Sequence, residues 1–214
     1  MADHVATETD TLREARAHLR AADPVLRALI DAHPDFDPRK WLAQLPTMDA
    51  FGALIFQVVG QQLSVAATRT LLMRIQDRFG GHLPTPQQVL AADPEILHTA
   101  GLSRRKVQTI HAIATEFAEH RITEETLRGM SDAEIEAQLT AISGVGSWTV
   151  HGFLIIALDR QDVVLPGDLA LRKAIQRTYG LDHLPSQDEV LGIAEAWRPY
   201  RTLATTYLFA SAYD

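Results

Sequence analysis

Apolar residues recur at three- and four-residue spacing along nearly the whole chain of 214 residues. Such spacing places side chains on one face of an α-helix, whereas a half-buried strand alternates apolar and polar residues with a period of two. No convincing alternation of that kind occurs. The sequence therefore predicts an all-α protein, and its length suffices for one large domain or two lobes.

Helix start signals are frequent and help to place the expected elements. A Ser or Thr followed three residues later by Glu, the form of a capping box, occurs at Thr11, Ser131 and Ser186. Prolines one residue after a Thr or Asp, as in a first helical turn, are Pro24, Pro86 and Pro94. The predicted helices are 9–31, 49–59, 62–79, 86–92, 103–120, 131–142, 147–159, 168–179, 187–197 and 200–212.

We expect these helices to form a two-lobed bundle. One lobe would comprise 9–46 and 166–214 and the other 47–165, with a disordered start at 1–8. The chain has no cysteine, which excludes disulfides, thiolate-bound zinc and iron–sulfur clusters and fits the reducing cytoplasm. It has neither a signal peptide nor an apolar run near 18 residues, so no membrane contact is expected.

One helix–hairpin–helix unit, residues 131–159, has the features of a phosphate-binding site. Glycines in its turn allow tight folding and remove the Cβ atoms that would hold a ligand away. The first N–H groups of the second helix lack partners within the helix and can donate to an anion. Phosphate contacts are therefore expected at Gly144, Val145, Gly146 and Ser147. Val145 would also anchor the turn, although the same glycines could serve only the packing of an αα-corner.

Basic residues elsewhere could support binding of an anion despite a formal net charge of −7. Binding depends on local patches more than on the overall balance of charge. Three groups stand at or near helix starts: Arg104, Arg105 and Lys106; Arg172, Lys173 and Arg177; Arg198 and Arg201. Each group taken alone could equally be a solvated helix face.

Asp168 follows an apolar run and a Pro-Gly pair and stands directly before a predicted helix. Asp is a favoured N-cap, and such a cap contributes about 0.5–2 kcal/mol to stability. From its position alone, capping is the simpler interpretation of Asp168.

The run LTAISGVGSWTVHGFLIIALDRQDVVLPGDLALRKAI, which ends before Gln176, resembles the motif of the helix–hairpin–helix-Gly/Pro-Asp superfamily of DNA glycosylases. In that superfamily the hairpin, a Gly/Pro-rich loop and one aspartate follow at this spacing. The similarity extends to 54–71, 100–110 and 196–209, and together these segments resemble the AlkA-type 3-methyladenine DNA glycosylases. Coverage from about residue 21 onward indicates a compact form without the N-terminal β domain of longer members.

The resemblance implies an enzyme that removes alkylated bases, chiefly 3-methyladenine and 7-methylguanine, from damaged double-stranded DNA, starting base excision repair. The base would be rotated out of the duplex, and Asp168 would stabilise the oxocarbenium-like sugar and assist water. An alkylated purine is cationic and leaves readily, so a single carboxylate suffices. Lyase-active relatives carry a nucleophilic lysine where this chain has Trp148. A monofunctional enzyme is therefore expected, because an indole cannot form a Schiff base.

Further site residues follow from the resemblance. The base pocket would include Trp148, Phe209 and Leu169. The aromatic faces of Trp148 and Phe209 would attract a cationic base. The side chain that fills the gap in the base stack would be Gln62 or its neighbour Leu63. Phe209 and Leu63 could instead be ordinary core residues.

No cofactor and no metal bound by side chains are expected, although hairpin carbonyls could hold Na⁺ or K⁺, and the protein is expected to be a monomer. Two other functions stay open. The first is a glycosylase for deaminated or mismatched bases on the same scaffold, which would need stronger leaving-group activation. The second is a hairpin protein that only binds DNA structure and needs Asp168 solely as a cap.

Overall fold

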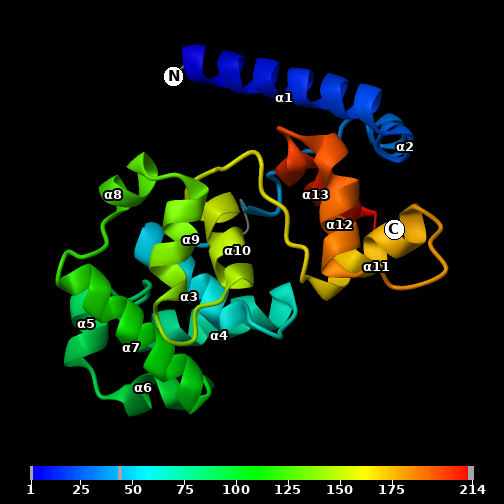
Figure 1. Ribbon diagram of the computed structural model, residues 1–214. Helices are drawn as coiled ribbons and strands as arrows, with labels where there is room; N and C mark the ends of the chain where they lie inside the picture. The colour runs from blue at the N-terminus through cyan, green and yellow to red at the C-terminus, as the bar shows by residue number, and fades with distance from the viewer. Residues whose placement is uncertain (1, 43–44, 212–214) are drawn as a thin grey trace. The chain divides into compact units, whose positions relative to one another are not determined.

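The computed structural model describes residues 2–42 and 45–211, with side chains from residue 10 onward. Every regular element in these ranges is a helix (Figure 1), which confirms the predicted all-α class. Within the described part of the chain, no helix combines the length and the apolar character needed to cross a membrane. The chain divides into two compact units, and each is considered by itself.

The first unit comprises Met1–Trp41 with Arg160–Asp214, and the second comprises Leu42–Asp159. The boundaries expected from the sequence lay a few residues later, at 46 and 165. The hairpin unit therefore ends with its second helix, and the loop that leads to Asp168 belongs wholly to the first unit.

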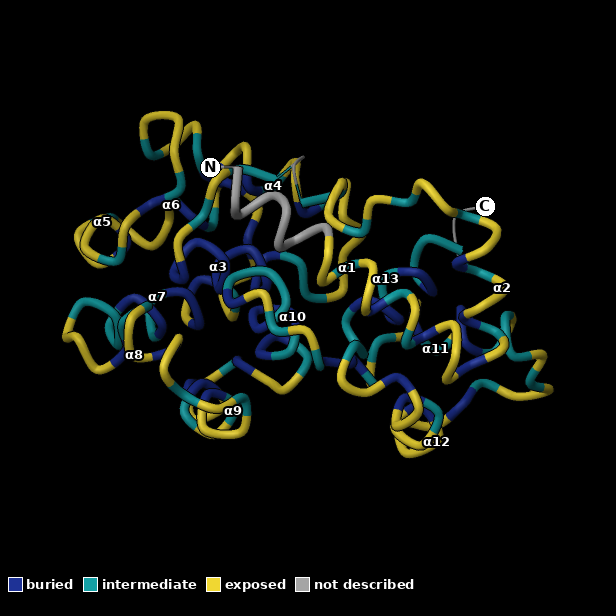
Figure 2. Tube along the Cα trace, turned by 90° about the horizontal axis from the view of Figure 1, so that it is seen from above, coloured by how far each residue is buried: buried dark blue, intermediate teal, exposed yellow. Residues whose placement is uncertain are grey.

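The helices of the second unit are α3 (Ala50–Gly60), α4 (Val65–Arg78), α5 (Pro86–Ala91), α6 (Pro94–Thr99), α7 (Arg104–Ala118), α8 (Glu124–Gly129), α9 (Asp132–Thr140) and α10 (Ser147–Ala157). Helix α3 is its centre, buried from Ala50 to Val59 (Figure 2) and packed against α4, α7 and α10. Gly152 permits the close approach of α10, because a Cβ at this position would lie 2.4 Å from Oε1 of the buried Gln57.

The helices of the first unit are α1 (Ala2–Ala22), α2 (Pro24–Ala32), α11 (Leu169–Thr178), α12 (Gln187–Ala194), the 3₁₀ helix η2 (Glu195–Trp197) and α13 (Arg201–Ala210). Asp23 lies at their centre and is only 5% exposed. Its Oδ1 caps α2 by accepting from the N–H groups of Val25 and Leu26. Its Oδ2 accepts from the Tyr179 hydroxyl, 2.5 Å away, and from Trp197 Nε1, 2.9 Å away.

This carboxylate adds a buried polar connection to the apolar core of the first unit. Burial and the hydrogen bond to Asp23 together raise the pKa of Tyr179 well above its ordinary value, so the phenol stays protonated and keeps donating. Three segments distant in sequence therefore meet on one side chain, and all four of its donors depend on it.

Some helix boundaries differ from those expected. The predicted helix 9–31 is interrupted at Asp23, where the Asp-Pro pair starts α2. Helix α1 begins at Ala2, whereas 1–8 was expected to be disordered. No Pro or Gly interrupts the chain before Thr11, so this residue lies inside α1 and does not cap it. The six-residue helices α6 and α8 were not predicted, although Pro94 carries a first-turn signal and the equally short α5 was predicted from Pro86.

Candidate functional site

The predicted helix–hairpin–helix unit is formed by α9 and α10. Its two glycines have different surroundings. Gly144 has a φ of +88°, and a Cβ there would lie 1.9 Å from Oγ1 of Thr109 on α7. Gly146 has a φ of −114°, and a Cβ there would meet no atom within 4 Å. Gly144 is therefore required by the packing of the hairpin, and only Gly146 borders open space.

A pair of alanine substitutions should separate these two glycines. Gly144→Ala combines left-handed backbone with a steric clash and should lower the free energy of unfolding by about 2–4 kcal/mol. Gly146→Ala should change it by less than about 1 kcal/mol, since Ala adopts this backbone and fills empty space. Urea titrations of both variants against the unchanged protein would measure the difference. Equal destabilisation by the two would contradict the assignment.

The start of α10 is open to an anion. Gly146 is its N-cap and provides no side chain to accept the first N–H groups of the helix. Those groups lack intrahelical acceptors, and the helix dipole favours negative charge beside them. Ser147 is exposed, whereas Val145 is buried and donates its N–H to Ile142 O. The turn can thus direct N–H groups toward solvent while the buried Val145 anchors it.

The three cations at the start of α7 do not share one environment. Arg104 and Arg105 are exposed in the first turn, which Ser103 caps. Lys106 is half-buried, and its Nζ donates to Val59 O at 2.8 Å and Gln61 O at 2.9 Å. Burial lowers the pKa of this ammonium below its ordinary value. Lys106 was expected to bind phosphate; two of the three N–H donors of its ammonium are directed to carbonyls at the end of α3.

The predicted insertion turn joins α3 to α4. Gln62 is exposed and has a φ of 61°, a left-handed conformation that is uncommon for a residue with a side chain. Leu63 is 42% exposed, which excludes the interpretation as a core residue. Ser64 caps α4 by accepting from Ala67 N–H at 3.2 Å. The side chains of Gln62 and Leu63 therefore extend from a turn whose C-terminal end is fixed by the cap of α4.

In the first unit, Asp168 is the N-cap of α11, as its position in the sequence suggested. Its Oδ1 accepts from Leu171 N–H at 2.9 Å, and its own N–H donates to Leu165 O at 3.0 Å. The carboxyl is half-buried. Capping and chemistry are compatible here, because the cap fixes the orientation of the carboxylate.

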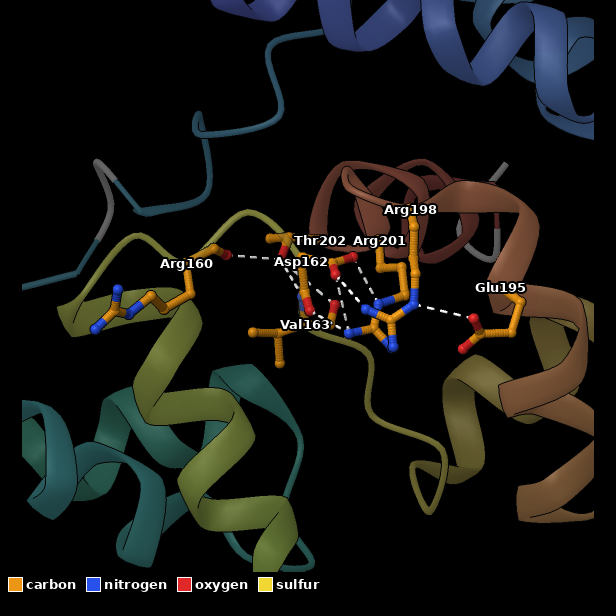
Figure 3. A network of polar contacts seen from close by, with 7 residues as sticks. All are labelled: Arg160, Asp162, Val163, Glu195, Arg198, Arg201 and Thr202. Carbon is orange, nitrogen blue, oxygen red and sulfur yellow. Dashed lines mark hydrogen bonds and ion pairs between the residues drawn. The ribbon is translucent and has the colours of Figure 1, made fainter. Parts of the chain in front are cut away.

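The loop before Asp168 is fastened to the start of α13 (Figure 3). Thr202 Oγ1 donates to Arg160 O at 2.7 Å and accepts from Val163 N–H at 3.1 Å. Asp162 accepts from Arg201 Nε and from Arg198 Nη1, each at 2.6 Å. Asp162 and Thr202 were missed in the sequence, since nothing local indicates partners some 40 residues away.

This network changes the interpretation of the C-terminal arginines. Arg198 also pairs with Glu195 at 3.0 Å, and Arg201 is held by both oxygens of Asp162. In the second basic group, Arg172 Nε donates to Pro185 O at 2.6 Å. Arg172, Arg198 and Arg201 therefore help to hold the fold together, whereas Lys173 is exposed.

The candidate pocket residues belong to different units. Trp148 lies half-buried in the first turn of α10, beside the hairpin. Phe209 lies half-buried near the end of α13, and Leu169, next to Asp168, is 53% exposed. Phe209 is thus not a fully buried core residue. Among the described residues, no group of three or more His, Asp or Glu side chains could hold a metal ion.

Comparison with known proteins finds a matching family model and similar sequences. A family model described as HhH-GPD superfamily base excision DNA repair protein matches residues 55–199. DNA-3-methyladenine glycosylase 1 of Schizosaccharomyces pombe is 30% identical over 204 residues, covering 94% of this chain and 88% of that protein. DNA-3-methyladenine glycosylase 2 of Escherichia coli is 28% identical over 171 residues, covering 76% of this chain and 57% of that protein.

Solved structures agree with these matches. The S. pombe 3-methyladenine DNA glycosylase in complex with abasic DNA has a TM-score of 0.84 and 29% identity, covering 94% of this chain and 97% of that chain. The 3-methyladenine DNA glycosylase of Archaeoglobus fulgidus has a TM-score of 0.77 and 26% identity, covering 97% of this chain and 76% of that chain.

Proposed function

Because this chain belongs to the HhH-GPD superfamily of base excision DNA repair proteins, as its motifs predicted, we propose that it is a monofunctional DNA glycosylase that removes alkylated bases from duplex DNA. The observation that carries the proposal is the fixed orientation of the Asp168 carboxylate. It caps α11 and follows a loop that is hydrogen-bonded to α13. The relatives named above are called 3-methyladenine glycosylases. We propose 3-methyladenine and 7-methylguanine as substrates on that ground.

The chemistry requires one carboxylate. After the base is rotated out of the stack, cleavage of the N-glycosidic bond develops positive charge on the sugar. Asp168 would stabilise that charge and orient or deprotonate the attacking water. Alkylation at N3 or N7 makes the purine cationic, so the bond breaks with little help from an acid. Water is the second substrate, and the reaction requires no redox cofactor.

The hairpin would bind the phosphodiester backbone. Peptide N–H groups at Gly146 and Ser147 can donate to phosphate oxygens, and the exposed Arg104 and Arg105 would add charge. Trp148 in the second unit and Phe209 in the first are each a candidate for stacking on a cationic base, with a cation–π attraction of about 0.5–2 kcal/mol. Leu169 would add an apolar contact beside Asp168.

A monovalent cation at the hairpin fits the donors that are present. Ile142 O accepts from Val145 N–H, and Gly144 O accepts from Gln61 Nε2. A carbonyl oxygen carries two lone pairs, so each retains capacity for Na⁺ or K⁺. Such an ion would add positive charge beside the phosphate, and no step proposed for Asp168 depends on it.

Release of free bases tests the proposal. Methylated duplex DNA is incubated with the protein and the released bases are identified, with 3-methyladenine and 7-methylguanine expected. Release of only deaminated or mismatched bases from suitable duplexes would favour the alternative glycosylase that acts on such bases. Tight binding of DNA with no release of any base would favour the non-catalytic hairpin protein and refute the proposal.

Trp148 supports the monofunctional assignment and leads to a separate prediction. An indole offers no amine to attack C1′, and the ammonium of Lys106 is bound by two main-chain carbonyls. Borohydride added during turnover should therefore trap no covalent enzyme–DNA adduct on a denaturing gel. A lyase-active glycosylase is the positive control. A trapped adduct would show that the enzyme is bifunctional.

A further inference from the structure

Gln61 connects the insertion turn to the hairpin within the second unit. It ends α3 as its C-cap and is half-buried. Its Nε2 donates to Gly144 O at 3.2 Å and to Thr149 Oγ1 at 3.0 Å. A primary amide has two N–H donors, so both bonds can form at once. One side chain thus reaches both the hairpin loop and the buried Thr149 in the first turn of α10.

The backbone of the same residue is held independently. Lys106 Nζ binds the carbonyl oxygens of Val59 and Gln61. These carbonyls lie at the C-terminus of α3, where helix carbonyls lack partners and the dipole favours a cation. The main chain at Gln61 is thereby attached to α7, while its side chain is attached to the hairpin.

The hairpin end of this connection is equally fixed. Gly144 O and Val145 N–H belong to one peptide group, in which the oxygen accepts from Gln61 and the N–H donates to Ile142 O. Thr109 leaves no room for Gly144 to shift toward α7. The peptide that precedes the outward N–H groups is therefore held on both sides.

The next residues of the turn follow the part that is held by the hydrogen bonds of Gln61 and Lys106. Gln62 is exposed in a left-handed conformation, and Leu63 donates its N–H to Gly60 O at 3.0 Å. Their side chains extend from a base fixed at Gln61. Small displacements of groups that engage a substrate lower rates steeply, by up to about 100-fold for 1 Å. The position of Gln61 thus controls where Gln62 and Leu63 stand relative to the hairpin.

We propose that Gln61 is a positioning residue that sets the register between the hairpin on the DNA backbone and the side chains that enter the base stack. The inference rests on the proposed function. Backbone binding at the hairpin would fix the strand, and Gln61 would place Gln62 opposite the base step to be opened. Gln61 itself would touch neither the damaged base nor its sugar.

The variant Gln61→Met tests this role, since Met is similar in length but lacks both donors. Single-turnover release from methylated duplex should fall by about tenfold, as expected when hydrogen bonds of ordinary strength no longer hold the turn. The Kd for an undamaged duplex of the same sequence should stay within about twofold, because the hairpin N–H groups remain. Gln87→Met, at an exposed position of α5, is the matched control and should change neither quantity.

Fluorescence of 2-aminopurine placed beside an abasic site follows unstacking without any base release. Gln61→Met should give a smaller rise than the unchanged protein. In the double variant with Gln62→Ala, the loss should not exceed that of the larger single change, because both act through one insertion step.

The outcomes separate the inference from the proposed function. Equal losses in release and in undamaged-duplex affinity would assign Gln61 to the hairpin alone and overturn the inference. Unchanged release and fluorescence, or additive losses in the double variant, would also overturn it. If the unchanged protein releases no base, the proposed function fails, whereas the fluorescence comparison still decides the role of Gln61.

Discussion

Asp168→Asn should lower the rate of base release from methylated duplex DNA by about 100- to 1,000-fold, the usual cost of removing one electrostatic contact to a developing charge. The amide keeps the shape of the carboxylate but neither stabilises an oxocarbenium-like sugar nor accepts a proton from water. Single-turnover release of 3-methyladenine would measure the loss.

The substitution separates chemistry from capping. Asn is as good an N-cap as Asp, so its side-chain oxygen can still accept from Leu171 N–H and the melting temperature should be unchanged. Asp49→Asn, the same change at the N-cap of α3, is the matched control and should release bases normally. Normal release by Asp168→Asn would reduce Asp168 to a structural cap and refute the proposed mechanism.

Asp23→Ala should have the largest effect on stability, lowering the free energy of unfolding by about 3–5 kcal/mol. The change leaves four donors without their acceptor: two N–H groups of α2, the Tyr179 hydroxyl and Trp197 Nε1. They are part of a buried site, so water cannot readily replace the carboxylate.

Urea unfolding followed by tryptophan fluorescence would measure this loss. Asp49→Ala removes an exposed N-cap that accepts from Gly52 N–H, and should cost about 1 kcal/mol. Similar losses for the two variants would mean that Asp23 acts only as a cap.

Local signals in the sequence predicted local structure well. The capping boxes at Ser131 and Ser186 form as expected, each with a Glu three residues on. The hairpin and the start of α11 at Asp168 also follow from short-range chemistry, since a cap needs only its own helix. Thr11 is the exception, because the same pattern occurs inside a helix that begins nine residues earlier.

The roles of the charged residues could not be predicted in this way. Lys106 and Arg201 look alike in sequence, as cations near helix starts, yet each binds oxygens far away along the chain. Asp23 precedes Pro24 and indicates a cap, but nothing near it indicates Tyr179 or Trp197. Long-range partners depend on the packing of whole helices, which hydrophobic periodicity alone does not specify.

The internal pairing of these cations has a consequence for how the protein would search DNA. Each cation that neutralises a phosphate displaces a counterion and steepens the salt dependence of binding, by about 0.9 in the log–log slope, whereas a peptide N–H does not. Because Lys106, Arg198 and Arg201 are bound to oxygens of the chain, they would contribute less to this term, and undamaged duplex would be released more quickly. Damaged bases are rare, so short visits allow more sites to be sampled in a given time. The ion pairs that fasten the loop of Asp168 would thereby also shorten each visit to intact DNA.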